Sequence, residues 1–399
     1  MPDDSFYPQI SQIPQIRNRG NRCNRWMGDW FLVLGSWFLV RCNRCNRWID
    51  PRRLSAVSIR FLAIIAVLSG VLATLCPGED THTVLNPPEL QILVSAALEH
   101  AYRQEYDAAQ DSVARVLERY PDNPAGYFFS GALKQLRMFD DGTNTLESSF
   151  MSDMLQAQNQ AGAILRNEKN AWAWQYIGAA YTYRAIFFGS RGRFWDTYRW
   201  GIQAAGPLKK ALDLDPSLSG ACLGLGVSEY FRYSGGRYLT GLNLFGSFPR
   251  SVALVDSAIH DSGYFSLTAQ YALAWMYAHE RRYPETYALL NQLLERYPGN
   301  RVFRKLLRDA YCMGKDYDEA IAVARELGLE LAQTQPDNLF AWTENQMTLA
   351  KSYFGAEDYG SALACCDSII SHECDQKRLP GLSGFIRDAK ALKRRLPEE

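Results

Sequence analysis

Few residues of this 399-residue chain have the types and spacing that catalysis requires. His279-Glu280 begins the His-Glu-x-x-His phrase of zinc proteases, but Tyr283 occupies the position of the second histidine. Gly224-Leu225-Gly226 lacks the third glycine of a dinucleotide-binding loop and follows no predicted strand. Neither a G-x-x-x-x-G-K-[ST] phosphate loop nor a G-x-S-x-G elbow occurs. We therefore expect no enzyme activity and no cofactor.

Metal ligands are equally sparse. No two of the five histidines are close enough in sequence to share one helix turn as ligands. Cys42 and Cys45 form a C-x-x-C pair, but only Cys23 is near them, and a structural zinc site needs four ligands. We expect no metal site. Five further cysteines give no disulfide framework, although Cys366 and Cys374 could bridge in an oxidising compartment: they are Cys222, Cys312, Cys365, Cys366 and Cys374.

Paired carboxylates are the remaining chemistry to weigh. Two carboxylates that face each other across a cleft would suit a carbohydrate-cleaving enzyme built as an α/α-toroid. The acid pairs Asp140/Asp141 and Asp213/Asp215 stand where turns or helix ends are predicted, and there we interpret them as solvated or capping residues. The toroid enzyme stays the less favoured alternative.

The net charge of zero is the sum of two unlike parts. Residues 1–76 contain ten Arg, no Lys and four acidic residues, which gives a charge of +6. Residues 77–399 contain 33 basic and 39 acidic residues, which gives −6. A general nucleic-acid binder needs a basic face to neutralise phosphates, so the acidic body argues against nucleic acid as a partner.

Residues 1–53 repeat short words letter for letter. Asn21–Trp26 (NRCNRW) returns unchanged at Asn43–Trp48, and WFLV occurs at 30–33 and again at 37–40. Folded domains rarely repeat in this way, because core and surface positions need different residues. We expect a low-complexity leader that is either disordered or translated from an incorrectly assigned start codon, and we exclude it from the fold.

Residues 54–76 have the form of an export segment. Arginines precede an uncharged apolar run of 16 residues from Phe61 to Cys76, as in a secretory signal. The run is short for a membrane span, which takes about 20 residues. A cleaved signal, a retained anchor and a lipid-modified Cys76 all stay open, although Leu75 is bulkier than the residue expected before a lipid-attachment cysteine. In each case we expect the rest of the chain to be exported, either periplasmic or membrane-anchored.

The remaining chain, residues 86–399, predicts one helix after another. Apolar residues recur at three- and four-residue spacing, and no segment alternates with period two for long. The phrase LERYPDN at 117–123 returns as LERYPGN at 294–300. Internal repetition on this scale is typical of a solenoid, in which each unit buries its apolar face against its neighbours.

The repeated unit resembles the tetratricopeptide repeat, which has W-x2-L-G-x2-Y on a first helix and A-x3-F on a second, followed by Pro. The best match is Trp174-x2-Ile177-Gly178-x2-Tyr181, and the resemblance covers about 89–376. It implies an all-α, right-handed α-solenoid of about six helix pairs, with the divergent residues 124–169 in one slot. We expect Gly384–Leu396, which is amphipathic, to cap the open end. Small residues should let paired helices approach closely: Gly178, Gly226, Ala274 and Ala350.

Two successive repeats are 48 residues long instead of 34. The additional residues fall within 187–200 and 230–250, and both stretches are rich in aromatic residues, Gly and Arg. Equivalent insertions in adjacent repeats project from the same edge. They are either hairpin loops that pack back onto the stack or a recognition surface, since aromatic residues and Arg dominate binding hot spots and Arg suits carboxylate or phosphate groups. The arginines that we select for partner binding are Arg191, Arg193 and Arg237.

The resemblance also implies a concave groove lined by first-helix residues. In this chain the groove would be aromatic and suited to an extended or helical peptide. We therefore predict a non-catalytic protein-interaction scaffold of the bacterial cell envelope, with a protein or peptide partner. The alternative is an envelope protein that contacts anionic lipid or glycan through its Arg and aromatic insertions. The corresponding groove residues are Trp172, Gln175, Tyr183, Tyr230, Phe231, Tyr271, Trp275 and His279.

Overall fold

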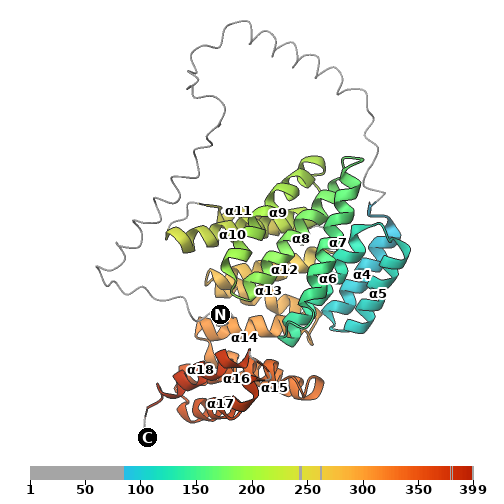
Figure 1. The fold of residues 1–399 in the computed structure, drawn as a ribbon. Helices are drawn as coiled ribbons and strands as arrows, with labels where there is room; N and C mark the ends of the chain where they lie inside the picture. The colour runs from blue at the N-terminus through green and yellow to red at the C-terminus, as the bar shows by residue number, and fades with distance from the viewer. Residues whose placement is uncertain (1–84, 242–244, 261–262, 378, 380, 398–399) are drawn as a thin grey trace, which may run out of the picture. The chain divides into compact units, whose positions relative to one another are not determined.

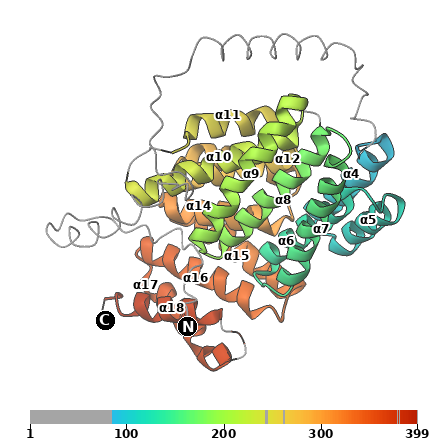
Figure 2. The same cartoon turned by 45° about the horizontal axis from the view of Figure 1, so that its top comes forward.

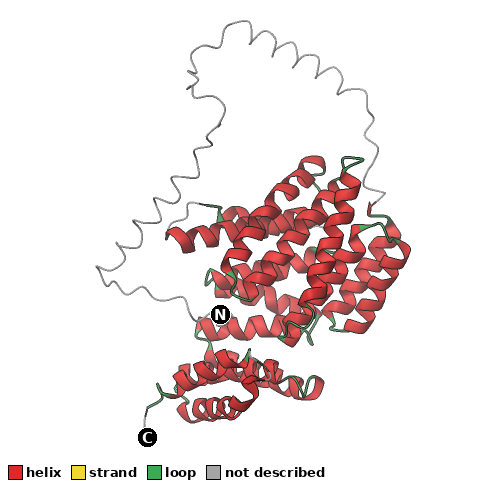
Figure 3. Cartoon of the chain, viewed as in Figure 1, coloured by secondary structure: helices red, strands yellow, loops and turns green. Residues whose placement is uncertain are grey.

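The computed structural model describes residues 85–397 except 242–244, 261–262, 378 and 380, and all regular structure in that part of the chain is helical (Figures 1 and 3). The predicted leader (1–53) and export segment (54–76) lie outside the described residues. The α-helices are α4 (Pro88–Tyr102), α5 (Tyr106–Arg119), α6 (Pro124–Asp141), α7 (Glu147–Leu165), α8 (Ala171–Ser190), α9 (Phe194–Leu214), α10 (Ser219–Thr240), α11 (Phe248–Ile259), α12 (Ser266–His279), α13 (Tyr283–Arg296), α14 (Arg301–Gly314), α15 (Tyr317–Thr334), α16 (Leu339–Gly355), α17 (Tyr359–Ser371) and α18 (Leu382–Lys393), with a 3₁₀ turn, η1 (Glu373–Lys377), before the last.

Consecutive helices pack as pairs, and each pair packs against the next (Figures 1 and 2). Helices α4 to α17 form seven such pairs in the described part of the chain, against the expected number of about six. The divergent residues 124–169 supply one complete pair, α6 and α7. Helix α18 packs on α16 and α17 through Phe385, Ile386 and Ala389, as expected of a capping helix. The predicted all-α solenoid of helix pairs is confirmed.

Asparagine side chains fix where several first helices begin. Asn123, Asn170, Asn300 and Asn338 are the N-caps of α6, α8, α14 and α16, and each side-chain oxygen accepts a backbone N–H from the first turn at 2.9–3.0 Å. Such a cap satisfies one of the N–H groups that a helix start leaves unpaired. The repeated phrase at 117–123 and 294–300 therefore lies at the junction between two pairs: it ends the second helix of one pair and caps the first helix of the next.

Small residues bring paired helices close, as the motif predicts. A Cβ atom on Gly226 of α10 would lie 2.6 Å from Val255 Cγ2 and 2.9 Å from the backbone oxygen of Ser251, both on α11. Ala274 and Ala350 are fully buried. The described residues of the two insertions, by contrast, lie mostly in lengthened helices and not in long hairpin loops. They extend α8, α9 and α10 to 20, 21 and 22 residues.

Replacing Gly226 with Ala tests the close approach of α10 and α11. We expect a loss of about 1–3 kcal/mol in the free energy of unfolding, because the new methyl group meets backbone as well as a side chain. The matched control is Gly162→Ala in α7, where nothing lies within 4 Å of the added Cβ. That variant should be stabilised by about 0.5–1 kcal/mol, the usual gain from Gly to Ala in a helix. Urea unfolding of both proteins measures the difference, and equal effects would contradict the packing argument.

Candidate interaction surfaces

The first helix pairs contact the fifth and sixth pairs through a polar seam. Asn300, the N-cap of α14, donates its side-chain amide to the carbonyl of Tyr102, the last residue of α4, at 2.8 Å. The hydroxyl of Tyr102 lies 2.6 Å from that of Thr268 in α12. Glu99 of α4 accepts a hydrogen bond from the Tyr297 hydroxyl at 2.7 Å. We call these contacts, together with those made by Asp140 and Asp141 of α6, the seam.

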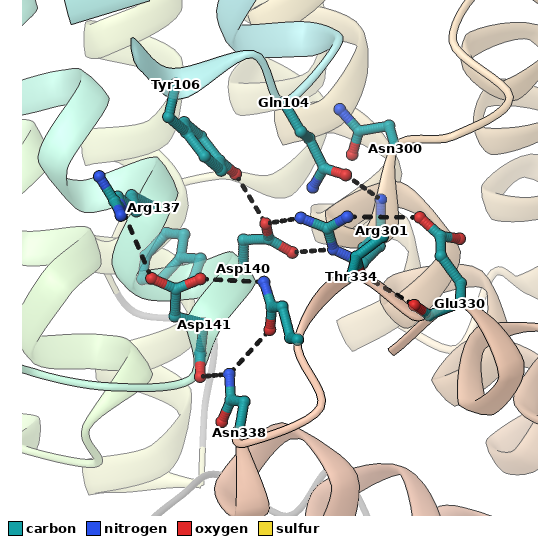
Figure 4. A network of polar contacts seen from close by, with 12 residues as sticks. Gln104, Tyr106, Arg137, Asp140, Asp141, Asn300, Arg301, Glu330, Thr334 and Asn338 are labelled. Atoms are coloured by element: carbon teal, nitrogen blue, oxygen red, sulfur yellow. Dashed lines mark hydrogen bonds and ion pairs between the residues drawn. The ribbon is translucent and has the colours of Figure 1, made fainter. Parts of the chain in front are cut away.

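The centre of the seam is a buried ion pair between α6 and α14 (Figure 4). Nε of Arg301 lies 2.8 Å from Oδ1 of Asp140, and Nη2 contacts Oδ2. Tyr106 of α5 donates its hydroxyl to the same carboxylate at 3.0 Å, and Lys305 donates to the carbonyl of Asp140 at 2.6 Å. Asp140 is completely buried, so every hydrogen bond to it replaces one to water. Burial and the charge of Asp140 raise the pKa of Tyr106, which keeps that phenol protonated as a donor.

Asp141 continues the seam to the following pair. Its carbonyl accepts from the amide of Asn338, the N-cap of α16, at 2.9 Å, and its carboxylate accepts from Gln335 at 3.0 Å (Figure 4).

The interpretation of Asp140 as a solvated or capping residue is wrong. Its side chain has no access to water and binds an arginine 161 residues away. Asp213/Asp215 fits the interpretation better, since Asp215 accepts from the backbone and side chain of Ser217.

The predicted groove residues lie mainly inside the protein. Trp172, Gln175, Tyr230 and Phe231 are buried, while Tyr183, Tyr271 and Trp275 are half-buried. The chain's own side chains occupy the space beside them. Phe128 and Phe129 of α6 pack on Tyr176 and Phe265, and Tyr102 of α4 packs on Phe303 of α14. The first helices of the first two pairs thus cover the face that the sequence predicts to be a groove.

The groove residues do not form one continuous set. The ring of Trp275 lies 5.6 Å from that of Tyr230 and 6.2 Å from that of Phe231, so these three come together. The ring centroid of Tyr183 instead lies 5.1 Å from that of Phe128. Tyr271 contacts Phe303 at 5.4 Å. Partner binding by these residues stays a prediction, and in this conformation a partner has no access to the buried ones.

Gln175 differs from the other groove residues because it is polar and unpaired. Its side chain is 1% exposed, and neither its amide nitrogen nor its amide oxygen has a hydrogen-bond partner within the described residues. It lies against Gly220 at the start of α10, where an added Cβ would be 2.9 Å from the amide carbon. More than nine in ten buried polar groups in proteins are hydrogen-bonded, and an unpaired amide costs about 1–3 kcal/mol.

The predicted arginines have different surroundings. Arg237 is already bound within the chain, since both of its terminal nitrogens lie 2.7 Å from the carboxylate oxygens of Glu280. These hydrogen bonds hold the pKa of Arg237 above its ordinary value. Arg191 donates to the carbonyl of Thr143 at 2.7 Å, and the exposed Arg193 pairs with Asp196. The structure therefore does not gather these three arginines at one open site.

The two lengthened repeats do meet along one edge, as the sequence predicts. The ring of Phe194 at the start of α9 lies 4.9 Å from that of Tyr238 at the end of α10. Next to it, Trp195 is 64% exposed and Tyr238 is 74% exposed. The composition of this stretch predicts a surface here, but its arginines, and not these two exposed aromatic residues, are the residues predicted to bind.

Other site types are absent from the described part of the chain. No group of three or more His, Cys, Asp or Glu residues is placed to hold a metal ion among the residues described. None of the described helices is long and apolar enough to span a membrane. The five described cysteines are free, so the Cys366–Cys374 bridge is not formed in this structure.

Comparison with known proteins gives structural similarities only. No family model and no curated protein matches the sequence. The Cut9–Hcn1 hetero-tetramer of the APC/C is 15% identical, with a TM-score of 0.46, over 79% of this chain and 57% of that one. A tetratricopeptide repeat protein from Parabacteroides merdae is 12% identical, with a TM-score of 0.36, over 75% of this chain and 98% of that one. The TPR domain of P58(IPK) is 11% identical, with a TM-score of 0.25, over 78% of this chain and 100% of that one.

This chain thus spans a little over half of the first of these structures. The assignment of the fold rests on the helix pairs and the motif spacing of this chain itself. The fold is tetratricopeptide-like.

Breaking the buried ion pair tests how much the seam contributes to stability. We expect Arg301→Met to lower the free energy of unfolding by about 3–5 kcal/mol, because Asp140 would keep a buried charge without its main partner. The control is Arg119→Met, whose ion pair with Glu89 is exposed and should contribute far less to stability. Denaturant unfolding at neutral pH compares the two, and similar losses would show that the seam is not a major constraint.

His279 should make stability depend on pH. It is half-buried, its ring centroid is 3.9 Å from that of Trp275, and its Nδ1 donates to the Trp275 carbonyl at 2.9 Å. Burial lowers its pKa below the ordinary 6.5. As the pH falls, this histidine therefore takes up a proton in the unfolded chain at a higher pH than in the folded protein. The contribution of neutral His279 to the free energy of unfolding is complete above about pH 6.5 and declines as the pH falls below that value.

The expected result for His279→Gln is a flatter decline in unfolding free energy between about pH 6.5 and pH 5. Denaturant unfolding at a series of pH values measures the slope. His260→Gln is the control, because His260 is exposed and lies at the end of α11. A slope in His279→Gln equal to that of the original protein would contradict the assignment.

Proposed function

We propose that this protein is a non-catalytic scaffold that binds a polypeptide segment on the aromatic face predicted to be its groove. We further propose that it works outside the cytoplasm at the bacterial envelope, which rests on the export segment at 54–76. Helical repeats present extended surfaces to partners, and that general property supports a protein-binding role. The residues of the face come from α8, α10 and α12.

The observation that carries the proposal is the unpaired amide of Gln175. An extended or helical peptide offers backbone N–H and C=O groups, and a glutamine amide can bind one of each. Gln175 stands at a position that faces the groove in the tetratricopeptide pattern. A group that costs stability in the free protein and gains hydrogen bonds in the complex is expected of a binding site.

Access to this face requires the seam to open. The seam holds α4 and α6 against α12 to α16, and α6 covers the aromatic face with Phe128 and Phe129. Its contacts are mostly hydrogen bonds and ion pairs, which water can replace when the surfaces separate. If only a small fraction of molecules is open, the apparent affinity for a partner is reduced by that fraction.

Replacing Gln175 with Leu separates the two roles of this residue. The side chain keeps its approximate size and loses the unpaired amide, so the free energy of unfolding should be unchanged or higher by about 1–2 kcal/mol. Binding should weaken about tenfold or more, since the partner's backbone groups would lose their hydrogen bonds in a buried site. Peptides selected from a displayed random library on the original protein supply the probe, and calorimetry measures their dissociation constants.

Two variants complete this experiment. Gln110→Leu is the matched control, because Gln110 is exposed on α5 and should change neither quantity. Arg301→Met should strengthen peptide binding by populating the open state. Unchanged peptide affinity in Gln175→Leu, or weaker affinity in Arg301→Met, would overturn the proposed site.

A further inference from the structure

The edge formed by the two lengthened repeats exposes large apolar side chains. Trp195 and Ile202 lie seven residues apart on α9, which places them on the same face of that helix. Tyr238 lies in the last turn of α10, and Phe245 lies in the connection to α11. Each of these four side chains is at least 43% exposed. We call them, together with Arg199 and Arg250, the aromatic–arginine edge.

Direct contacts join the parts of this edge that lie on α9 and α10. The ring of Phe194 lies 5.4 Å from that of Trp195 and 4.9 Å from that of Tyr238, so it joins α9 to α10. One turn further along α9, Tyr198 packs on Gly235 of α10. Phe245 packs on the neighbouring Gly236. The two glycines allow this close approach, because an added Cβ would lie 3.0 Å from Tyr198 at Gly235 and 2.9 Å from Phe245 at Gly236.

The charges of the edge are positive. Arg193, Arg232 and Arg237 pair with Asp196, Glu229 and Glu280, which neutralises them. Arg199 and Arg250 are exposed, and neither forms an ion pair among the residues described. Arg199 lies on α9 between Trp195 and Ile202, and Arg250 lies in the first turn of α11. This basic edge belongs to a body that carries a charge of −6 over residues 77–399.

We propose that the aromatic–arginine edge binds the surface of an anionic lipid bilayer. Trp and Tyr have an apolar body and a polar tip, which suits the boundary between headgroups and acyl chains. Ile202 and Phe245 add apolar area that the bilayer would cover. Arg199 and Arg250 can extend to lipid phosphates while their methylene stems stay in contact with the apolar layer. The guanidinium of Arg199 lies over the ring of Trp200, 5.3 Å from its centroid, so it has an aromatic but no acidic partner among the described residues. Exposed apolar side chains beside arginines without acidic partners favour a bilayer over a single protein anchor.

This surface is separate from the proposed peptide site. Gln175 is buried between α8 and the start of α10, whereas the edge is exposed at the other end of α10 and at the start of α9. Failure of one proposal therefore leaves the other standing. The edge also does not depend on whether residues 54–76 are retained, because it could hold an exported body at a membrane without an anchor.

Vesicle flotation of the full chain tests the proposal. The vesicles are phosphatidylcholine alone or phosphatidylcholine with phosphatidylglycerol, each at low and high salt. Residues 61–76 are apolar and could bind vesicles themselves. They are unchanged in every variant, so differences in flotation between variants measure the contribution of the edge. The aromatic variant is Trp195→Ser with Tyr238→Ser. Its control is Ile92→Ser with Leu329→Ser, which removes two side chains that are each 68% exposed on α4 and α15.

The charge variant is Arg199→Gln with Arg250→Gln. Its control, Arg115→Gln with Arg166→Gln, removes two exposed arginines on α5 and at the end of α7. We expect the charge variant to lower partition into phosphatidylglycerol vesicles about tenfold or more at low salt and to have little effect at high salt. The aromatic variant should lower partition at both salt concentrations, and both controls should behave like the original protein. Circular dichroism checks that each variant is folded.

Two results would overturn the proposal. Partition that is equal for both edge variants and their controls would show that the edge does not contact lipid. Edge variants that float normally but no longer bind the library-selected peptides would identify the edge as a protein-binding surface instead.

Discussion

The arrangement of the described chain depends on helix ends that meet across the seam. The carbonyl groups at the C-terminal ends of α4 and α6 need hydrogen-bond donors, and the asparagines that cap α14 and α16 supply them. Each of these asparagines uses its oxygen within its own helix and its nitrogen across the seam. One side chain thus satisfies two helix ends, which ties the start of a helix to the end of another nearly 200 residues earlier.

The Asp140–Arg301 pair makes this arrangement specific. A capping asparagine could bind any nearby carbonyl, but a fully buried carboxylate requires a cation in one position. Arg301 is the residue directly after the cap Asn300, so the ion pair and the cap select the same alignment of α14 against α4 and α6. Contacts over such sequence distances are slow to form, because loop closure must precede them. The nearest-neighbour contacts between helix pairs are therefore expected to form first, and the seam last.

The sequence predicts what is local and periodic. Gly178, Gly226 and the small residues that follow them reveal the close helix contacts because each repeat must solve the same packing problem. The aromatic edge was located for a similar reason, since two adjacent repeats carry insertions of similar composition. The seam is different, because it joins non-adjacent repeats and no periodic signal records it. Asp140 and Arg301 each resemble ordinary charged residues at helix ends, and only the curvature of the stack brings them together. The repeat pattern also predicts correctly that the groove residues lie on first helices. It does not record that α6 covers them.

The two proposed binding surfaces differ in burial and charge, and so they would require different partners. A partner for the buried face would have to offer hydrogen bonds, because Gln175 is buried and an unpaired buried amide is costly. A partner for the edge must offer negative charge over a broad area, because Arg199 and Arg250 stand apart among exposed rings. The body carries a net charge of −6 over residues 77–399, so an anionic bilayer would repel it as a whole while attracting the basic edge, which would favour an orientation with the edge toward the bilayer. Salt would weaken this orienting force and leave the buried face unaffected, because screening acts on exposed charges far more than on buried ones.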